Sequence, residues 1–323
     1  ATGYLIGPPN KGLACMFTFM NTARIGTAIQ GLAHAEQSFQ GALAYAKERL
    51  AMRSLTGPKN ADGPADPIIV HPDVRRMLMR QKVLNEGMRA LALFTGHQLD
   101  LSEACTDPAE REAADDLVQL LTPVVKAFLT DEGFNNANVA LQVLGGSGFT
   151  KDWPLEQLVR DSRITRIYEG TNGIQAMDLV GRKLAMGGGR LIGRLFTLLD
   201  DYLSHHAATP HAGQLADAVA GLKQATLWIV ENGPTDPEQA AAAATPYLRL
   251  MALAMIAYLW SRMAYEAQTQ LEAGTGNTAL LEGKVVSAQY YFDKLLPETQ
   301  WLLEDITNGK ESIMALQEQH WAA

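Results

Sequence analysis

The stretch GLACMFTFMNTARIGTAIQGLAHAEQSFQGALAYAKERLAMR, residues 12–53, decides the fold class. Apolar side chains recur in it at Leu32, Phe39 and Leu43, with spacings of seven and four residues. Because an α-helix turns once in about 3.6 residues, these spacings place the apolar side chains on one face. We therefore predict a long amphipathic helix over residues 12–53, with one side covered by other elements.

The helical pattern returns three more times in the first half of the chain. Residues 54–70 contain several dipeptides that end in proline, which cannot continue a helix and instead predict a loop. A second helix is predicted from Pro72, a third over residues 109–130 and a fourth over residues 133–144. Four long amphipathic helices with mostly short connections predict an antiparallel four-helix bundle.

Helical patterns also fill the second half of the chain. Two further helices, over residues 154–159 and 174–186, lead to a triple glycine at residues 187–189, where we expect a boundary. The polar and apolar alternation of a β-strand is nearly absent. The predicted fold class is therefore all-α, a four-helix bundle followed by an additional helical domain. Its helices are expected over residues 191–205, 212–231, 237–271 and 284–306.

Composition and charge narrow the class of protein. The 323 residues include 27 basic and 35 acidic side chains, a formal net charge of −8, so no nucleic-acid partner is expected. The longest apolar run, residues 250–260, is too short for a membrane span, so we expect neither a membrane span nor a signal peptide at the start of these residues. Cys15 and Cys105 are the only cysteines, and no spacing of metal ligands is present. We predict a cytoplasmic protein without a metal site. Because Ala1 is not an initiator Met, we expect a portion of a longer protein.

Two glycine-rich segments could carry chemistry. QVLGGSGF, residues 142–149, is on general grounds a helix end and a turn. RIYEGTNGIQ, residues 166–175, places a carboxylate and a hydroxyl in a glycine-flanked loop just before a helix. Thr171 or Asn172 could equally serve to cap that helix. A third segment, YAKER at residues 45–49, would normally be an exposed helix end.

In this order, the three segments resemble the C-terminal region of the acyl-CoA dehydrogenase family. IYEGT followed by a glutamine four residues later, with QVLGGSGF about 20 residues upstream, is a specific pattern. The resemblance covers roughly residues 1–184. The remainder resembles the extension of a larger bacterial branch that includes long-chain and 3-methylmercaptopropionyl-CoA dehydrogenases. The segments that carry the resemblance are residues 3–13, 20–24, 48–49, 142–146 and 167–175.

The resemblance implies a flavoenzyme that introduces a trans double bond between the α and β carbons of an acyl-CoA thioester. Residues 1–11 would end its middle β domain, residues 12–188 would form the helical bundle and residues 189–323 the additional helical domain. FAD would be the cofactor and an electron-transferring flavoprotein the electron acceptor. The assembly would be a homodimer or a higher homo-oligomer.

Glu169 matches the family's catalytic base, which removes the α-proton while a hydride leaves the β carbon for flavin N5. Such a base works best when it is desolvated, since burial raises the pKa of a carboxyl group. Gly170 and Thr171 match positions beside the flavin, where glycine lets the backbone approach the ring and the hydroxyl can hydrogen-bond.

Three residues match the substrate side of the family's site. Arg24 corresponds to an arginine close to the active-site carboxylate and the pantetheine arm, and a buried arginine needs a partner. At Asn21, smaller relatives carry an aspartate that supports CoA binding, and Tyr168 precedes the base. Three apolar side chains either line the acyl pocket or belong to the core: Met16, Phe17 and Met20.

Four residues match positions that contact the flavin of a neighbouring subunit, and a fifth, His71, matches a position near the cofactor in some members. Arg49 corresponds to an arginine that reaches the FAD pyrophosphate, which suits a planar guanidinium. Gln142, Gly145 and Gly146 correspond to contacts with the adenosine half. His71 either lies near the cofactor or simply begins the second helix.

Two other readings remain open at this point. An acyl-CoA oxidase would share the residues of this region and differ in using O2 to reoxidise the flavin. A non-catalytic helical module for dimerisation would need no active site, although the glutamate of IYEGT and the arginine at position 49 argue against it.

Overall fold

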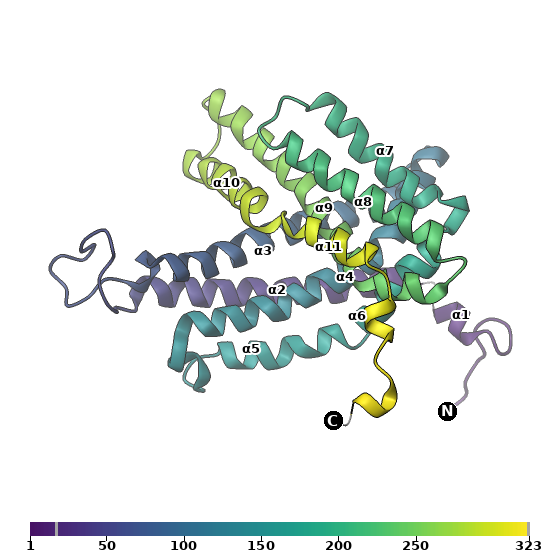
Figure 1. Cartoon of the computed structure of the whole chain (residues 1–323), viewed down its shortest axis with the longest axis horizontal. Helices are drawn as coiled ribbons and strands as arrows, with labels where there is room; N and C mark the ends of the chain where they lie inside the picture. Colours follow the sequence, from purple (N-terminus) through teal and green to yellow (C-terminus); the bar gives the residue numbers. More distant parts are fainter. Residues whose placement is uncertain (17–18, 322–323) are drawn as a thin grey trace.

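The computed structural model describes residues 1–16 and 19–321, and the regular elements in that part of the chain are helices (Figure 1). The β contact found among these residues is an isolated antiparallel bridge between Leu50 and Pro67. The predicted all-α fold class is therefore confirmed. The α-helices are α1 (Gly12–Met16), α2 (Met20–Glu48), α3 (Pro72–Ala104), α4 (Pro108–Leu144), α5 (Leu155–Ser162), α6 (Asn172–Asp178), α7 (Arg190–His205), α8 (Ala212–Asn232), α9 (Pro237–Glu272), α10 (Thr278–Tyr290), α11 (Glu298–Thr307) and α12 (Glu311–Met314).

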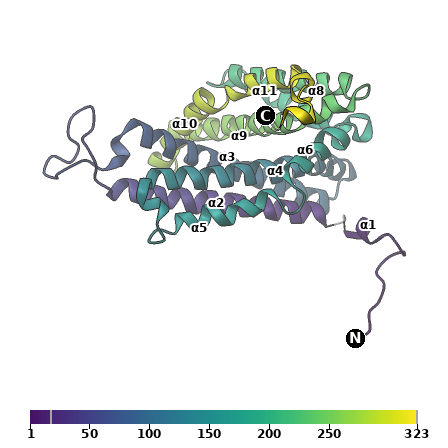
Figure 2. The ribbon, with the colours of Figure 1, turned by 60° about the horizontal axis from the view of Figure 1, so that its bottom comes forward.

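Helix α4 differs from its prediction. Residues 109–130 and 133–144, predicted as two helices, belong to one continuous helix of 37 residues. Gly133 does not break it, because this glycine is buried where α4 crosses α2. A Cβ atom on Gly133 would lie 2.5 Å from the carbonyl oxygen of Gly31, so only glycine permits this close approach. The short helix α5 takes the fourth place in the bundle, against α2 and α4 (Figure 2).

Three other predicted helices differ in length from their predictions. The helix predicted over residues 174–186 is α6, which ends at Asp178 and is followed by a π-turn at Leu179–Lys183. The first helix divides into α1 and α2, and α2 ends at Glu48 rather than at Arg53. Beyond it the chain is extended and donates hydrogen bonds to, and accepts them from, residues 66–68. The helix predicted over residues 284–306 is divided by a π-turn at Tyr291–Leu295 into α10 and α11.

Asp66 organises the loop between α2 and α3. Its buried carboxylate accepts hydrogen bonds from the backbone N–H groups of Ser54 (2.8 Å), Lys59 (2.9 Å) and Asn60 (2.7 Å). The Ser54 hydrogen bond is the main cause that lowers the pKa of Asp66 to about 2; burial opposes it, and Asn60, Lys59 and Arg53 reinforce it. The predicted loop is thus a defined structure around one carboxylate.

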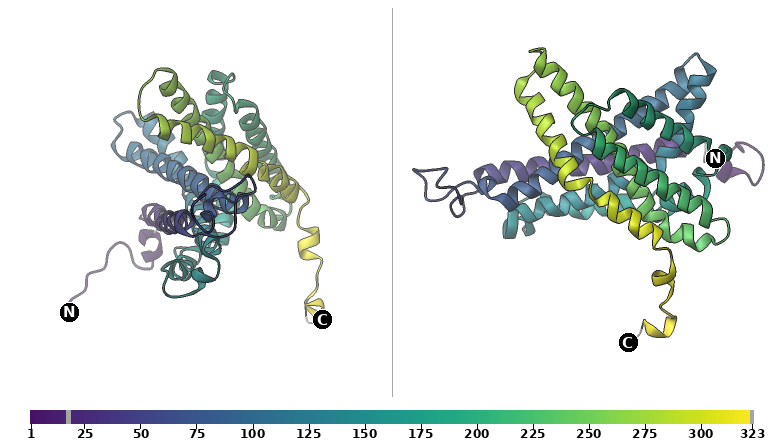
Figure 3. Two further views of the ribbon diagram at one scale, coloured as in Figure 1. Left: turned by 90° about the vertical axis from the view of Figure 1, so that its left-hand side faces the viewer. Right: turned by 45° about the horizontal axis from the view of Figure 1, so that its top comes forward.

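The helices after the triple glycine form a second layer on the bundle, as both views of Figure 3 show in green and yellow. Helix α9 lies at its centre and contacts α3, α4 and α6 on one side and α8, α10 and α11 on the other. By length and composition α9 could cross a membrane, but 67% of its most apolar window is buried inside the fold. A core helix passes the same test, so the absence of a membrane span stays a prediction.

One hydrophobic core extends across the predicted boundary at residues 187–189. The same cluster contains Leu84 and Phe128 of the bundle and Leu195 and Trp260 of the second layer. The three glycines have φ values of 60°, 67° and 87°, a backbone region that side chains disfavour, and they turn the chain into α7. The division into two domains remains a prediction, because the layers share their core.

A buried ion cluster joins the two layers. The Glu132 carboxylate on α4 is fully buried and accepts hydrogen bonds from Arg80 on α3 and Arg249 on α9, each at 2.8 Å. Arg249 also pairs with Glu298 on α11. Burial alone would raise the pKa of Glu132, but the two guanidinium groups outweigh burial and lower the pKa.

We expect Gly31→Ala to destabilise the fold by about 1–3 kcal/mol, because its Cβ would lie 2.6 Å from the Leu129 carbonyl oxygen. Gly26→Ala is the matched control, since a Cβ on this exposed glycine of the same helix meets no atom within 4 Å. It should stabilise the fold by about 0.5–1 kcal/mol. Denaturant unfolding measures the change in the free energy of unfolding for each variant. Equal stabilities of Gly31→Ala and Gly26→Ala would contradict the close crossing of α2 and α4.

The Asp66 loop should open in acid. The folded-state pKa of Asp66, about 2, lies below the ordinary value of 3.8, so its contribution to stability is complete above pH 3.8 and disappears as the pH falls through 2. Hydrogen exchange at the Ser54, Lys59 and Asn60 amides, corrected for intrinsic rates, should accelerate over that range before exchange in α9 does. Asp66→Asn should accelerate the same amides at pH 7. Unchanged protection in this variant would show that the carboxylate does not hold the loop.

Candidate active site

Glu169 lies on an irregular loop between the 3-10 turn that ends at Arg166 and helix α6. Its φ is 58°, and φ of Gly170 is 83°. A residue with a Cβ atom adopts this left-handed backbone only where its surroundings hold it, and such residues cluster at functional sites. The Glu169 side chain is partly buried, and within the described residues its carboxylate makes no hydrogen bond or ion pair. A free carboxylate on a constrained backbone is suited to act as a base.

A buried lysine on α4 binds this loop through hydrogen bonds. Lys126, in the middle of α4, is fully buried, and its Nζ donates to the Gly170 carbonyl and to Asn172 Oδ1, each at 2.8 Å. Burial lowers the pKa of Lys126 to about 8; Asp131 opposes this shift and Arg24 adds to it. Lys126 is not among the site residues predicted from the sequence. A lysine inside the apolar run VVKAFL was the signal that could have revealed it.

Other contacts complete the loop. Gln175 is buried and its Nε2 donates to the carbonyl oxygens of Glu169 (3.2 Å) and Gly170 (3.4 Å). Thr171 Oγ1 accepts from the Ile174 N–H and caps α6, so the capping role considered from the sequence is present. The Tyr168 hydroxyl donates to Gln30 on α2. The loop is therefore attached to α2, α4 and α6.

Arg24 lies beside the same loop. One of its terminal nitrogens is 3.9 Å from the Cβ position of Gly170, and another is 3.8 Å from Asp178 Oδ2. Asp178, which Arg182 also binds, is the partner that a buried arginine requires. Arg24 Nε is buried and has no hydrogen-bond partner in the described residues. Asn21 lies one helical turn before Arg24, so both side chains face the same way.

Met16 and Met20 are partly buried near the start of α2, whereas Phe17 lies outside the described residues.

The other predicted site residues lie at the opposite end of α2 and α4. The Tyr45 hydroxyl donates to Ser147 in the turn after α4 at 3.2 Å, so the last turn of α2, which ends just before Arg49, is joined to the turn that contains Gly145 and Gly146. His71 Nε2 donates to the Ala51 carbonyl at 2.8 Å and thereby joins the start of α3 to the segment that follows α2. His71 is also the N-cap residue of α3, so its structural role is evident, and a role near a cofactor is untested.

This end of the molecule presents an open surface. Gly145 and Gly146 are exposed, and a Cβ on either would meet no atom within 4 Å. Gly145 needs its φ of 59° to end α4, but nothing inside the described chain requires glycine at Gly146. Arg49 and Gln142 are exposed, and their side chains make no hydrogen bond or ion pair within the described residues. The surface can therefore accept an anionic ligand or another subunit.

The structure divides the predicted site residues into two groups. Lys126, behind the Glu169 loop, and Gly145 are separated by the C-terminal half of α4. At about 1.5 Å per residue, that length of helix is about 28 Å. Within one chain, the two groups therefore belong to different sites.

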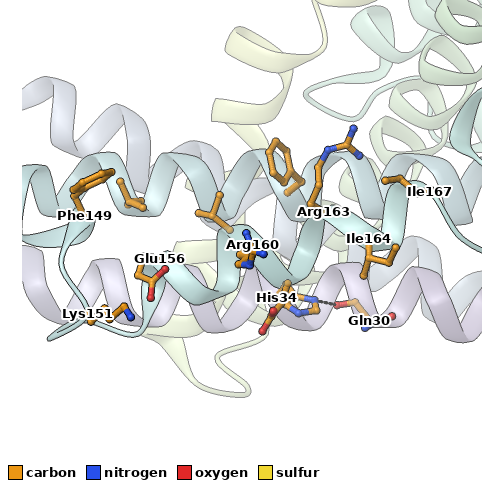
Figure 4. A pocket seen from close by; sticks show the side chains of 13 residues that line it. Gln30, His34, Phe149, Lys151, Glu156, Arg160, Arg163, Ile164 and Ile167 are labelled. Carbon is orange, nitrogen blue, oxygen red and sulfur yellow. Dashed lines mark hydrogen bonds between the residues drawn. The ribbon is translucent and has the colours of Figure 1, made fainter.

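A groove with a volume of about 1080 Å³ lies along α2, α4 and α5 (Figure 4). One end is formed by Ile167, next to the Tyr168 contact with Gln30, and the other by Phe149 and Lys151. None of the predicted site residues lines this groove. In residues 1–16 and 19–321, no group of three or more His, Cys, Asp or Glu residues is arranged to hold a metal ion.

Comparisons with known proteins assign the chain to a family. The family model described as acyl-CoA dehydrogenase, C-terminal domain, matches residues 10–184, more than half of the chain. A second model, described as acetyl-CoA dehydrogenase C-terminal like, matches residues 195–317. The 3-methylmercaptopropionyl-CoA dehydrogenase of Ruegeria pomeroyi is 37% identical over 97% of this chain and 53% of that protein. The chain spans about half the length of three curated relatives that it matches.

Two solved structures have the same fold. ACDH-11 of Caenorhabditis elegans, in complex with C11-CoA, gives a TM-score of 0.73 at 18% identity and covers 96% of this chain and 48% of that one. An acyl-CoA dehydrogenase of Bacillus anthracis, in complex with FAD, gives 0.70 at 16% identity over 95% of this chain and 51% of that one. The family model covers more than half of the sequence and the fold agrees with it: the chain belongs to the acyl-CoA dehydrogenase family.

Proposed function

We propose that this chain, as part of a longer protein, supplies the catalytic base and part of the flavin site of an FAD-dependent acyl-CoA dehydrogenase. The observation that carries the proposal is the free Glu169 carboxylate on a loop that buried side chains hold in a left-handed conformation. The name of the Ruegeria pomeroyi relative supports an acyl-CoA thioester as the class of substrate.

The reaction removes a proton from the α carbon and a hydride from the β carbon, and it yields the trans-2-enoyl-CoA. Glu169 accepts the α-proton, and the electron pair of the broken α C–H bond forms the double bond as the hydride leaves the β carbon. Bound FAD would accept this hydride at its N5 atom. The carboxylate is available for the proton because it makes no ion pair within the described residues.

We assign Arg24, Asn21 and Tyr168 to the substrate side. Arg24 lies beside the glutamate loop, and its buried Nε lacks a partner in the described residues, so a ligand atom or a residue outside this chain can complete its hydrogen bonds. Gly170 and Thr171 are assigned to the flavin ring. The exposed Thr171 N-cap and the glycine backbone leave space for a planar group to approach.

The second group of residues fits the pyrophosphate and adenosine half of FAD. Arg49 offers an unpaired guanidinium, which can bind a pyrophosphate with two parallel hydrogen bonds. Gly145 and Gly146 carry no side chain and no other described residue covers them, so their backbone can approach the nucleotide. Gln142, in the last turn of α4, offers an amide group close to them in sequence. His71, which orders the segment after Arg49, is assigned to the same surface.

We further propose a homodimer or higher homo-oligomer, because α4 separates the two groups by about 28 Å. The Arg49 surface of one subunit would then serve the flavin beside Glu169 of the other. The electron acceptor is proposed to be an electron-transferring flavoprotein, and the location the cytoplasm. The proposed domains are residues 1–11, the end of a β domain, then 12–188, the bundle, and 189–323, the additional helical domain.

Glu169→Gln in the full-length protein should lower turnover at least about 100-fold and leave FAD bound, because the change keeps the shape of the side chain and removes only the base. Acyl-CoA oxidation with a dye acceptor measures turnover, and the flavin spectrum measures retention. Glu103→Gln, at an exposed position near the end of α3, is the control and should be fully active. Turnover above about a tenth of the wild-type rate would exclude Glu169 as the base. Wild-type reoxidation by O2 as fast as by dye would favour an oxidase.

Arg49→Ala should weaken FAD binding by about 1.5–3 kcal/mol, roughly 10- to 150-fold in affinity, because a charge-assisted contact is lost. Gly146→Ala should also weaken FAD binding, although its new methyl group meets no atom of this chain and should leave stability unchanged. Titration of the apoprotein with FAD measures the affinities, with Arg111→Ala, an exposed arginine at the start of α4, as the control. Wild-type FAD affinity in both variants would show that this surface is an exposed helix end that does not bind the flavin.

A further inference from the structure

Lys126 is a buried charged group that the proposed chemistry does not use. Its side chain is fully buried inside α4, in the run Val124–Leu129, where every other residue is apolar. Burying an ammonium group is costly unless it is hydrogen-bonded or paired. The partners of Nζ are the Gly170 carbonyl and Asn172 Oδ1, 44 and 46 residues away in sequence, and both belong to the segment that follows Glu169.

We propose that Lys126 is a positioning residue for Glu169: its hydrogen bonds to Gly170 and Asn172 hold the loop in the conformation that presents the carboxylate as a base. The inference rests on the proposed function, in which Glu169 removes the α-proton. Lys126 does not touch the substrate in this account: it acts through the backbone that carries Glu169, and its charge also interacts with the Glu169 carboxylate without a direct contact.

Asn172 makes the attachment specific. While its Oδ1 accepts from Lys126, the two hydrogens of its Nδ2 are shared among three acceptors on α4: the Ala127 carbonyl, Thr130 Oγ1 and Asp131 Oδ1. The side chain that begins α6 is therefore bound to α4 through both of its polar atoms. Because Lys126 binds both Asn172 and the Gly170 carbonyl, it fixes the short segment between Glu169 and the start of the helix.

The backbone of Glu169 explains why such an attachment is needed. Its φ of 58° is unfavourable for a residue with a Cβ atom, so the free loop would relax towards negative φ. That change would rotate the Glu169 side chain away from its present direction. Two hydrogen bonds oppose this change: Gln175 on α6 donates to the carbonyl of Glu169, and Lys126 on α4 donates to the carbonyl of Gly170.

The charges around Lys126 are consistent with this role. Arg24 faces it from α2, Asp131 from α4 and Glu169 from the loop, and Arg166 pairs with Asp131. Burial lowers the pKa of Lys126 to about 8, so its ammonium form predominates at neutral pH. The Lys126 charge lies behind the loop, where its two hydrogen bonds restrain the backbone without pairing with the Glu169 carboxylate.

The chain provides a closely matched control. Lys183 is also buried, and its pKa is likewise lowered to about 8, mainly by burial. Its Nζ donates to Gln119 Oε1 on α4 and, within the described residues, makes no hydrogen bond or ion pair with the glutamate loop. Replacing either lysine with methionine removes one buried ammonium at nearly constant volume, so general effects of losing a buried charge should be alike.

The test uses the full-length holoenzyme with Lys126→Met, Lys183→Met and Glu169→Gln. At saturating acyl-CoA, Lys126→Met should reduce the rate of flavin reduction at least 30-fold, while KM and FAD affinity change less than threefold. Lys183→Met should stay within twofold of the wild type. Hydrogen exchange on the same proteins, without substrate, should accelerate at the amides of residues 168–172 in Lys126→Met only.

The outcomes separate the two proposals. If Glu169→Gln is inactive but Lys126→Met reduces its flavin at the wild-type rate with an unchanged loop, the positioning role is overturned and the base assignment stands. If Glu169→Gln is active, the proposed function itself fails. If Lys126→Met and Lys183→Met lose the same fraction of the flavin-reduction rate, Lys126 has a merely structural role. Should Lys126→Met not fold, Asn172→Ala takes its place, since it removes one acceptor of Lys126; a wild-type rate in that variant overturns the inference.

Discussion

The fold depends on one buried carboxylate. Glu132 has no access to water, so its charge is tolerable only with Arg80 and Arg249 in place, and these arginines come from α3 and α9. Arg249 in turn binds Glu298 of α11. The pair of layers must therefore assemble together, because removing either arginine would leave a buried charge without its partner. The continuous hydrophobic core that surrounds the cluster is consistent with this coupling.

Helix α4, which carries Glu132, also determines the geometry of the candidate site. Its middle holds the glutamate loop through Lys126, and its C-terminal end presents Gly145 and Gly146 on an open surface. A single rigid helix therefore sets the separation of about 28 Å between the two groups of residues. The close crossing at Gly31 and Gly133 fixes how α2, with Arg24 at one end and Arg49 at the other, lies along it.

A base that must accept a proton from carbon needs two properties that oppose each other. It must be rigidly placed, yet its carboxylate must remain unpaired. In this loop the restraints act on the backbone and on Asn172, and the Glu169 carboxylate makes no hydrogen bond or ion pair in the described residues. The left-handed backbone of Glu169 is tolerated because buried donors on α4 and α6 hold the adjacent carbonyl groups.

The sequence by itself determined the helical class, most helix boundaries and the two motif segments, because periodicity, proline and glycine act over a few residues. It predicted a partner for Arg24 without identifying Asp178, and it proposed Glu169 without indicating what holds it. Tertiary structure alone decided that Gly133 lies inside a helix, since only the approach of Gly31 gives that glycine a packing role. It also decided the partners of Lys126, which are 44 and 46 residues away in sequence. Local patterns carry no information on which buried donor meets which distant acceptor, because that pairing arises only when the helices pack.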